Sequence, residues 1–317
     1  METALTLKPK NVWREIWKQR WFHLFVLVGI VFLIIFNYLP MVGIIIAFKN
    51  YRLSGGILGM FTSEWVGLKH FRDFFRDPMF GKLMINTLVL SVLKMIFLFP
   101  FPIFLAVVLN ETKSLKVKRV VQTVSYLPYF ISWVVVVGFC TIFMSTSNGV
   151  INDFFKMIYG QPLNLLTGAK YFRPIAIITA LWKETGWWTI IFLAAITSID
   201  PELYDAAKID GASRLQRIRH ITLTGIKPTI TVVLILALGN LLGGGLSGSN
   251  FEQSYLLGNS ANADTSQIIQ VYVLQQGLAQ GRYSYAASAG LFQSLISIVM
   301  IFGSNFVAKR VSGEGLF

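Results

Sequence analysis

Charge is scarce in this chain of 317 residues, of which only 14% are Asp, Glu, Lys or Arg while 54% are hydrophobic. A soluble domain carries about 25% charged residues, so the composition excludes an ordinary soluble fold. Acidic residues are scarcest, 15 against 28 Lys and Arg. The net charge of +13 does not indicate nucleic-acid binding, because the basic residues gather at the ends of apolar runs. With Cys140 as its single cysteine, the chain cannot form an internal disulfide.

The chain also lacks the motifs of an enzyme. Gly81 and Lys82 have neither the upstream glycine nor the following hydroxyl of a phosphate-binding loop, and no His-Glu-x-x-His zinc motif occurs. The three histidines (His23, His70 and His220) are far apart and fall on different sides of the predicted membrane. We therefore predict no catalytic residue, no metal site and no cofactor bound by this chain.

Long apolar runs predict an all-α membrane protein. A spanning helix needs about 20 apolar residues, and residues 24–47 carry no charge. No small-residue cleavage site follows this run, so we interpret it as an uncleaved first span and not as a signal peptide. The fifth span is the weakest prediction, because it ends in the glycine-rich stretch 242–246, where a helix is expected to unwind. Six transmembrane helices are predicted, at 22–48, 83–109, 120–144, 174–199, 229–245 and 286–308.

The distribution of Lys and Arg predicts the orientation. These residues gather in the N-terminal segment, in the second-to-third and fourth-to-fifth loops, and at the C-terminus, so both termini are expected in the cytoplasm. The chain is accordingly divided into a cytoplasmic N-terminal segment (1–21), a first transmembrane helix with an external loop (22–82), a core transmembrane domain (83–308) and a cytoplasmic tail (309–317). Within the core lie a cytoplasmic loop (201–224) and a polar external loop (246–285).

A short charged segment, within residues 201–224, separates the predicted fourth and fifth spans. Asp200 suits a helix N-cap, Pro201 suits the first helical turn, and Asp205 complements the helix dipole. Gly211 permits a tight turn, after which a second helix is predicted over 213–223. Such a helix pair fits a groove on a soluble partner, or it lies as a basic amphipathic segment against anionic lipid headgroups. The spacing alone leaves both interpretations open.

Residues 205–224 resemble the EAA motif of binding-protein-dependent ABC importer permeases. That pattern reads Glu-Ala-Ala, two residues, Asp-Gly-Ala, eight residues, Ile, one residue, Leu-Pro. Here Asp205 replaces the glutamate and Thr224 replaces the proline, which leaves the end of the helix to Pro228. The resemblance implies that this loop couples the chain to an ATPase through Asp205, Ala206, Asp210, Gly211, Ala212, Arg214 and Leu215.

Further short sequence segments resemble those of the oligosaccharide and polysaccharide permease branch of carbohydrate importers. They lie at 38–43, 48–51, 65–71, 86–88, 126–129, 283–287 and 290–294. The resemblance implies a type I ABC importer permease fold (MetI-like) in the bacterial cytoplasmic membrane and a carbohydrate substrate, expected to be an oligosaccharide. It also implies three kinds of partner: a second six-helix permease, expected to be a different chain; two ABC ATPase subunits that hold ATP and Mg²⁺; and an extracytoplasmic solute-binding protein, which residues 246–285 would face.

Two charges interrupt the fourth span. The run from Trp187 to its end is too short to cross a core of about 30 Å, so Lys183 and Glu184 are expected within the depth of the membrane, where each charge costs about 2.5–3.5 kcal/mol. Trp187 and Trp188 share a helical face with Glu184, and aromatic rings beside a carboxylate suit a sugar. A solute path is therefore predicted at these four residues and at Asn240. A structural ion pair and an interfacial tryptophan belt are the alternatives.

Three roles stay open for Lys94 in the second span: pairing with Glu184, lining the solute path, or snorkelling towards the interface. Gln293 in the sixth span offers a choice between the solute path and an interhelical hydrogen bond. Two functional alternatives also stay open. One is an ABC importer for a non-sugar solute, because the EAA loop is shared across solute classes. The other is an ion-coupled secondary transporter, which would need several intramembrane carboxylates, whereas Glu184 is the only clear candidate.

Overall fold

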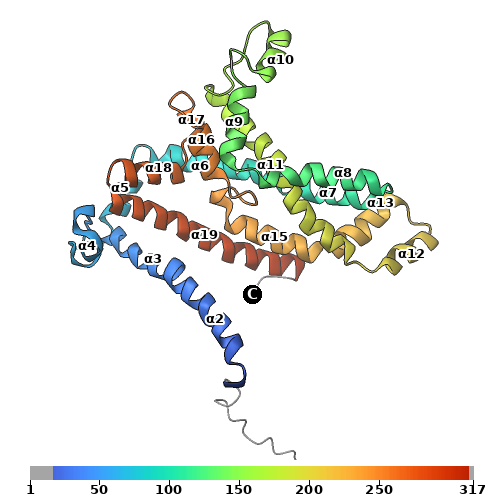
Figure 1. The fold of residues 1–317 in the computed structure, drawn as a ribbon, viewed down its shortest axis with the longest axis horizontal. Coiled ribbons are helices and arrows are strands. Elements are labelled where there is room, and N and C mark those ends of the chain that lie inside the picture. Colours follow the sequence, from blue (N-terminus) through green and yellow to red (C-terminus); the bar gives the residue numbers. More distant parts are fainter. Residues whose placement is uncertain (1–16, 314–317) are drawn as a thin grey trace, which may run out of the picture.

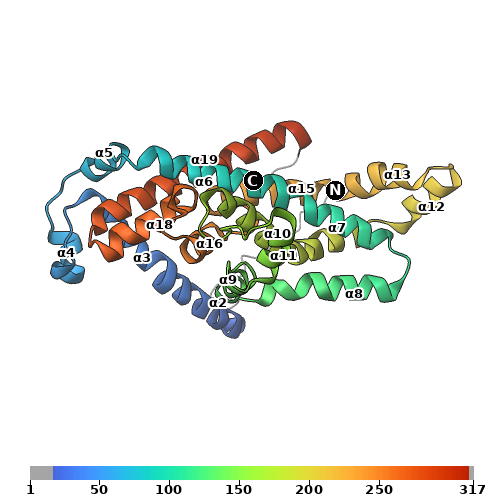
Figure 2. The same ribbon diagram turned by 90° about the horizontal axis from the view of Figure 1, so that it is seen from above.

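The computed structural model describes residues 17–313, within which the regular structure is helical apart from one isolated β-bridge between Lys49 and Trp65. The molecule is elongated (Figures 1 and 2). Helices α4 (Gly56–Thr62) and α5 (Lys69–Phe75) lie at one end, and α12 (Pro201–Ile209) and α13 (Arg214–Arg217) lie at the other. The cytoplasmic assignments predicted for 1–16 and 314–317 fall outside the described residues.

An apolar arm precedes the bundle. It consists of α2 (Arg20–Leu33), a π-helical turn (Ile34–Tyr38), α3 (Leu39–Met41) and a 3-10 helix (Val42–Phe48), which together cover the predicted first span. Only 6% of the most apolar stretch of this arm is buried, and Figure 1 shows the arm diverging from the other helices. An exposed apolar surface of this extent requires lipid or another protein subunit as its cover.

The centre of the bundle is α11 (Ala169–Thr197), which packs along α6 (Phe80–Leu98) and α7 (Pro100–Glu111). Nearly half of its residues are buried, including Lys183 and Glu184. A Cβ at Gly186 would lie 2.0 Å from the backbone oxygen of Ser125, so the glycine permits α8 (Leu115–Tyr126) to approach α11 closely.

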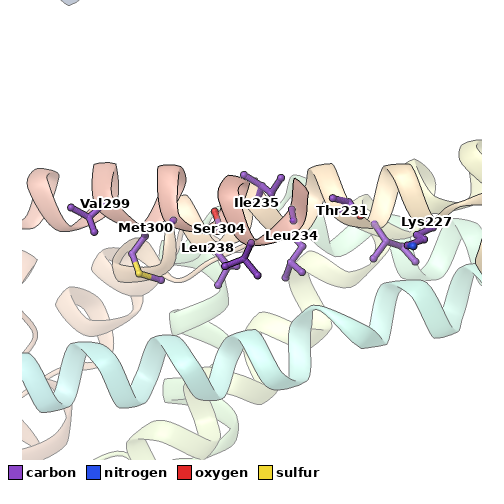
Figure 3. Close-up of a pocket in the computed structure, with 12 residues that line it drawn as sticks. Lys227, Thr231, Leu234, Ile235, Leu238, Val299, Met300 and Ser304 are labelled. Carbon is purple, nitrogen blue, oxygen red and sulfur yellow. The ribbon is translucent and has the colours of Figure 1, made fainter. Parts of the chain in front are cut away.

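A second helix pair is formed by α15 (Lys227–Gly239) and α19 (Tyr283–Ser312). An apolar groove of about 630 Å³ lies between them, with Leu234 and Leu238 on one side and Val299 and Met300 on the other (Figure 3). Lys227 lies at one end of the groove. Such a surface is suited to the hydrocarbon of a membrane and not to water.

Within residues 17–313 the helices give three to five candidate spans by length and composition, where the sequence predicts six. The stretches Arg20–Phe48, Phe80–Glu111 and Tyr283–Arg310 are each long and apolar enough to cross a membrane. Two more candidates are broken helices, Leu115–Phe130 with Trp133–Phe143 and Arg214–Gly225 with Lys227–Gly239, bent by 102° and 59° respectively.

The predicted third span, 120–144, is not one straight helix but two helices joined by a sharp bend. The chain turns sharply after a 3-10 turn (Leu127–Phe130), and Ser132 then caps α9 (Trp133–Phe143) by accepting a hydrogen bond from the Val135 N–H at 3.4 Å. The predicted unwinding after the fifth span is confirmed, because α15 ends at Gly239 and both Gly244 and Gly245 have positive φ.

The remaining helices lie in the connections. They are α10 (Val150–Tyr159), α14 (Leu223–Gly225), α16 (Asn250–Leu257), α17 (Ala263–Ser266), α18 (Ile269–Leu274), the 3-10 turns Leu53–Gly55 and Leu241–Gly243, and the π-helical turns Ile218–Thr222 and Gln275–Ala279. Segment 246–285, predicted only as a polar loop, is therefore largely helical. Figure 1 shows α16, α17 and α18 close together.

Candidate functional site

The predicted coupling loop folds as a hinged pair of helices. The Asp200 carboxylate accepts a hydrogen bond from the Glu202 N–H at 2.9 Å, and Pro201 occupies the first turn of α12, as the sequence predicts. Gly211 has a φ of +75°, a conformation that glycine adopts without strain. The Ala212 N–H then donates to the Ala207 oxygen at 2.8 Å and closes the end of α12.

The second helix of the pair begins at a capping box. The Ser213 hydroxyl accepts from the Gln216 N–H, and the Gln216 side chain accepts from the Ser213 N–H at 2.7 Å. Helical structure then continues through α13, a π-helical turn and α14 to Gly225. The helix ends at Gly225, shortly before Pro228, as expected. Pro228 itself lies in the first turn of α15, where its missing N–H leaves no intrahelical bond unmade.

Three side-chain contacts attach the hinged pair to the bundle and to itself. Arg214 donates to the Glu111 carboxylate at 2.6 Å and to the Glu111 backbone oxygen at 3.0 Å, which joins α13 to the end of α7. Tyr204 on α12 shares a hydrogen bond of 3.0 Å with Thr222. Lys208 pairs with Asp205 at 2.7 Å within α12. The loop is thus a folded unit linked to the transmembrane helices.

The outer face of this unit is open. Ile209 is 87% exposed and Leu215 75% exposed, although both are large apolar side chains. Of the seven residues predicted to couple to an ATPase, six are exposed and Ala212 is half-buried. All seven lie at the α12–α13 end, and three of them, Asp205, Asp210 and Arg214, are charged. Exposed apolar side chains ringed by charge are typical of a protein docking surface.

One of the two charges of α11, Lys183, contacts the bend between α8 and α9, and Glu184 lies beside it. The Lys183 ammonium donates to the Tyr129 backbone oxygen at 2.7 Å and lies 3.7 Å from the Glu184 carboxylate. It also lies over the rings of Tyr129 and Trp133, 5.0 and 5.6 Å from their centroids. Both charged side chains are 7% exposed, so each charge depends on these partners.

The other predicted path residues also have partners within the protein. The Trp187 ring stacks on Tyr129 at 4.7 Å, and the Trp188 indole donates to the Leu246 oxygen at 3.2 Å. The Asn240 amide donates to the Gly245 oxygen at 3.1 Å and supports the glycine-rich turn after α15. The structure thus brings Lys183, Glu184 and Trp187 together around one bend and places Trp188 and Asn240 beside the turn at 240–246.

Sequence reasoning missed a polar face on α16. The fully buried Lys94 donates to the Ser249 hydroxyl at 3.1 Å, Asn250 donates to Ser91 at 2.8 Å, and Gln253 donates to the Ala176 oxygen at 2.8 Å. One carboxylate oxygen of Glu252 is buried without a hydrogen-bond partner in the described residues. The signal was present in the sequence, since residues 247–254 carry amides and hydroxyls directly after the glycine-rich stretch.

A second polar cluster lies near the α4–α5 end of the molecule and is centred on Asp77. The hydroxyls of Tyr272 and Tyr285 both donate to the Asp77 carboxylate, at 2.5 and 2.6 Å. Burial acts to raise the pKa of Asp77, but these bonds, the Met79 N–H and the Arg282 charge together lower it below its usual value. The cluster joins the loop before α6 to α18 and α19.

Comparison with known proteins places these features in a family. Residues 98–313 match the family described as "Binding-protein-dependent transport system inner membrane component". The matched segment contains the hinged loop, the α8–α9 bend and the polar face of α16.

Individual relatives match nearly the whole chain. Protein LplB of Bacillus subtilis (strain 168) is 44% identical over 300 residues, 95% of this chain and 92% of that protein. A polygalacturonan/rhamnogalacturonan transport system permease protein of the same organism, YteP, is 42% identical over 310 residues, covering 98% and 94%. A crystal structure of a bacterial ABC transporter involved in the import of the acidic polysaccharide alginate contains a chain that is 37% identical and superposes with a TM-score of 0.86, covering 96% of this chain and 100% of that one.

Proposed function

This chain belongs to the family of binding-protein-dependent transport system inner membrane components, and we propose that it is the permease subunit of an ATP-driven importer for an oligosaccharide. It is a multispan component of the inner membrane, and it is not the ATPase. The observation that carries the proposal is the hinged α12–α13 pair. It turns at Gly211, exposes Ile209 and Leu215 and lies in the segment that the family shares.

The loop suits a mechanical role. Because Arg214 joins α13 to α7 and α12 directly follows α11, a force on the loop acts on two neighbouring helices of the core. We assign the α12–α13 end to the cytoplasm, where two ATPase subunits would grip the loop and would hold the ATP and Mg²⁺. The coupling residues are those named from the EAA resemblance, from Asp205 to Leu215. The proposed transport cycle is alternating access driven by closure of the ATPases.

The fold we propose is the six-span permease fold, with α11 as the fourth span. Its 29 residues are long enough to cross a membrane. Its interruption by Lys183 and Glu184 is compatible with a position inside the bundle, because both charges are buried and paired.

The saccharide substrate is supported by the relatives. The second relative is a polygalacturonan/rhamnogalacturonan permease protein, a third is an arabinooligosaccharide permease protein that is 28% identical over 286 residues, and the similar solved transporter imports alginate. A further structure of that transporter includes an alginate pentasaccharide-bound periplasmic protein. By analogy we propose an external solute-binding protein and a second, different permease chain as partners.

For the solute path we propose the polar interior formed by α6, α11 and α16, with Glu184, Lys183, Trp187, Trp188 and Asn240 at or beside it. The internal contacts of Lys183 and Trp187 favour a supporting role for these two side chains. The polar face of α16 adds donors and acceptors to this interior.

Reconstitution into proteoliposomes tests the function. We expect uptake of a labelled oligosaccharide only when both permeases, the ATPases, the binding protein and internal ATP are present. Uptake that continues without ATP under an imposed proton or sodium gradient would overturn the proposal in favour of a secondary transporter. ATP-dependent uptake of amino acids but of no saccharide would overturn the substrate assignment alone.

A further inference from the structure

The segment between α15 and α19 contains a cavity that the proposed transport mechanism does not use. Its volume is about 350 Å³, and it lies among the end of α16, the turn 258–262, α17 and the start of α18. Figure 1 shows these helices side by side. The lining consists of hydroxyl and amide side chains with one aromatic ring and a few small residues, and it contains no charged side chain.

The walls of the cavity are fixed by asparagines. The amide of Asn262 donates to the Leu166 and Leu257 oxygens at 2.9 and 3.0 Å, and Asn259 donates to the same Leu166 oxygen at 3.0 Å. These bonds anchor the turn to the segment that leads into α11. At Gly258 a Cβ would lie 2.2 Å from the Ser254 oxygen, so no side chain fits there. The cavity is therefore held in shape before any ligand arrives.

Two groups at this cavity are open to a ligand, and a third, a buried hydroxyl, lies in its wall. Ser254 is 2% exposed, and its buried hydroxyl has no hydrogen-bond partner in the described residues. The Gln267 amide donates to Gln275 across a long 3.3 Å bond, which a ligand hydroxyl can replace. The Tyr255 ring is 52% exposed and is backed by Phe251, whose ring stacks on it at 5.6 Å. A flat aromatic face beside amides and a hydroxyl suits the C–H and O–H groups of a pyranose.

We propose that this cavity is a saccharide subsite on the outer side of the permease, and that it binds one or two pyranose units through their hydroxyl groups and not through carboxylates. The volume lies at the lower end of ligand pockets, which span about 300–1,000 Å³. The neighbouring charges are unavailable, because Lys82 and Asp264 pair with each other at 2.5 Å. A carboxylate in the cavity would lack a cationic partner. The inference rests on the proposed function and specifies where the permease first contacts the sugar.

Saturation-transfer NMR on the purified importer in nanodiscs tests the subsite. The probes are neutral trisaccharides of glucose, galactose or mannose, with trigalacturonate as the acidic counterpart of galactotriose. We expect ring-proton signals from at least one neutral trisaccharide, and affinity for trigalacturonate about tenfold weaker than for galactotriose. A tenfold loss corresponds to about 1.4 kcal/mol. Absence of signal from every neutral probe, or equal binding of galactotriose and trigalacturonate, would overturn the inference.

Variants locate the binding. Gln267→Ala and Tyr255→Ala should each weaken the signal several-fold, whereas Gln280→Ala, an exposed glutamine of the same segment outside the lining, should leave it unchanged. Undiminished binding in both lining variants would refute the location. ATP-dependent uptake separates the two proposals. If a variant with an impaired cavity still imports saccharide normally, the subsite proposal is refuted and the proposed function stands. If the wild-type importer transports no saccharide, the proposed function itself is refuted.

Discussion

Replacement of Gly211 tests whether the α12–α13 hinge transmits force. Gly211 has a φ of +75°, but a Cβ there would meet no atom within 4 Å. The strain of a substitution therefore comes from the backbone alone. An L-residue in the left-handed region costs about 1–2 kcal/mol, whereas asparagine tolerates that region best among the non-glycine residues.

The expected order of coupling is Gly211, then Gly211→Asn, then Gly211→Ala, with Gly211→Val the most impaired. A strain of about 1–2 kcal/mol lowers the ratio of turned to unturned hinge by about fivefold to thirtyfold. The bulkier Gly211→Leu adds an apolar side chain to the docking face and should uncouple hydrolysis from transport. The assay is the number of solute molecules imported per ATP hydrolysed in proteoliposomes.

Gly81→Ala is the matched control, because Gly81 has equally open surroundings but a helical backbone in α6. It should leave coupling unchanged. The hinge argument fails if Gly211→Asn is as impaired as Gly211→Val, or if Gly211→Leu supports normal uptake. Membrane insertion and ATPase co-purification of each variant separate a loss of coupling from a loss of folding.

Three further changes test other contacts. Arg214→Ala should reduce coupling while lowering stability by about 1 kcal/mol, since the Arg214 side chain is 63% exposed although that of Glu111 is only 22% exposed, and a double-mutant cycle with Glu111→Gln should show non-additive loss of uptake. Lys183→Met should destabilise the fold by about 3–5 kcal/mol, because Glu184 and the Tyr129 oxygen lose their partner. Near-normal yield and thermal stability of this variant would contradict the stabilisation of the α8–α9 bend by Lys183. Asp77→Asn should lower stability by about 1–2 kcal/mol at neutral pH, because two tyrosine hydroxyls lose a charged acceptor. Since the pKa of Asp77 is lowered in the folded state, its stabilisation is present above the unfolded pKa of about 3.9 and is lost as pH falls through the folded value, so melting curves of wild type and variant should converge in acid.

The coupling loop was the most predictable part of the molecule. Asp200, Pro201 and Gly211 act on their own neighbours through a cap, a first turn and a left-handed turn, so their effect can be inferred from local sequence. The same holds for the glycines that end α15. Pro228 follows the end of one helix and begins the next, because proline is compatible with both positions.

The bend between α8 and α9 was not predictable by the same means. An apolar run over 120–144 satisfies the length rule for a span whether it is straight or broken. What holds the 102° bend is a long-range contact, the Lys183 ammonium on the Tyr129 oxygen and on two aromatic rings. The sequence indicated that Lys183 lies at membrane depth, but it contained no indication of which segment would receive the charge.

The same reasoning explains why the buried polar residues of this chain contact two different segments. Lys183 and Trp187 contact the α8–α9 bend, whereas Lys94 contacts Ser249 at the start of α16. Helix α11 contacts both groups, through Lys183 and through the Ala176 oxygen that accepts from Gln253 of α16, and the α12–α13 hinge follows it in the chain. Motion of the hinge along α11 would therefore displace the bend and the polar face of α16 relative to each other. A disulfide that fixed α11 to α8 should block transport even with the hinge intact, and it should leave binding of the ATPase subunits unchanged.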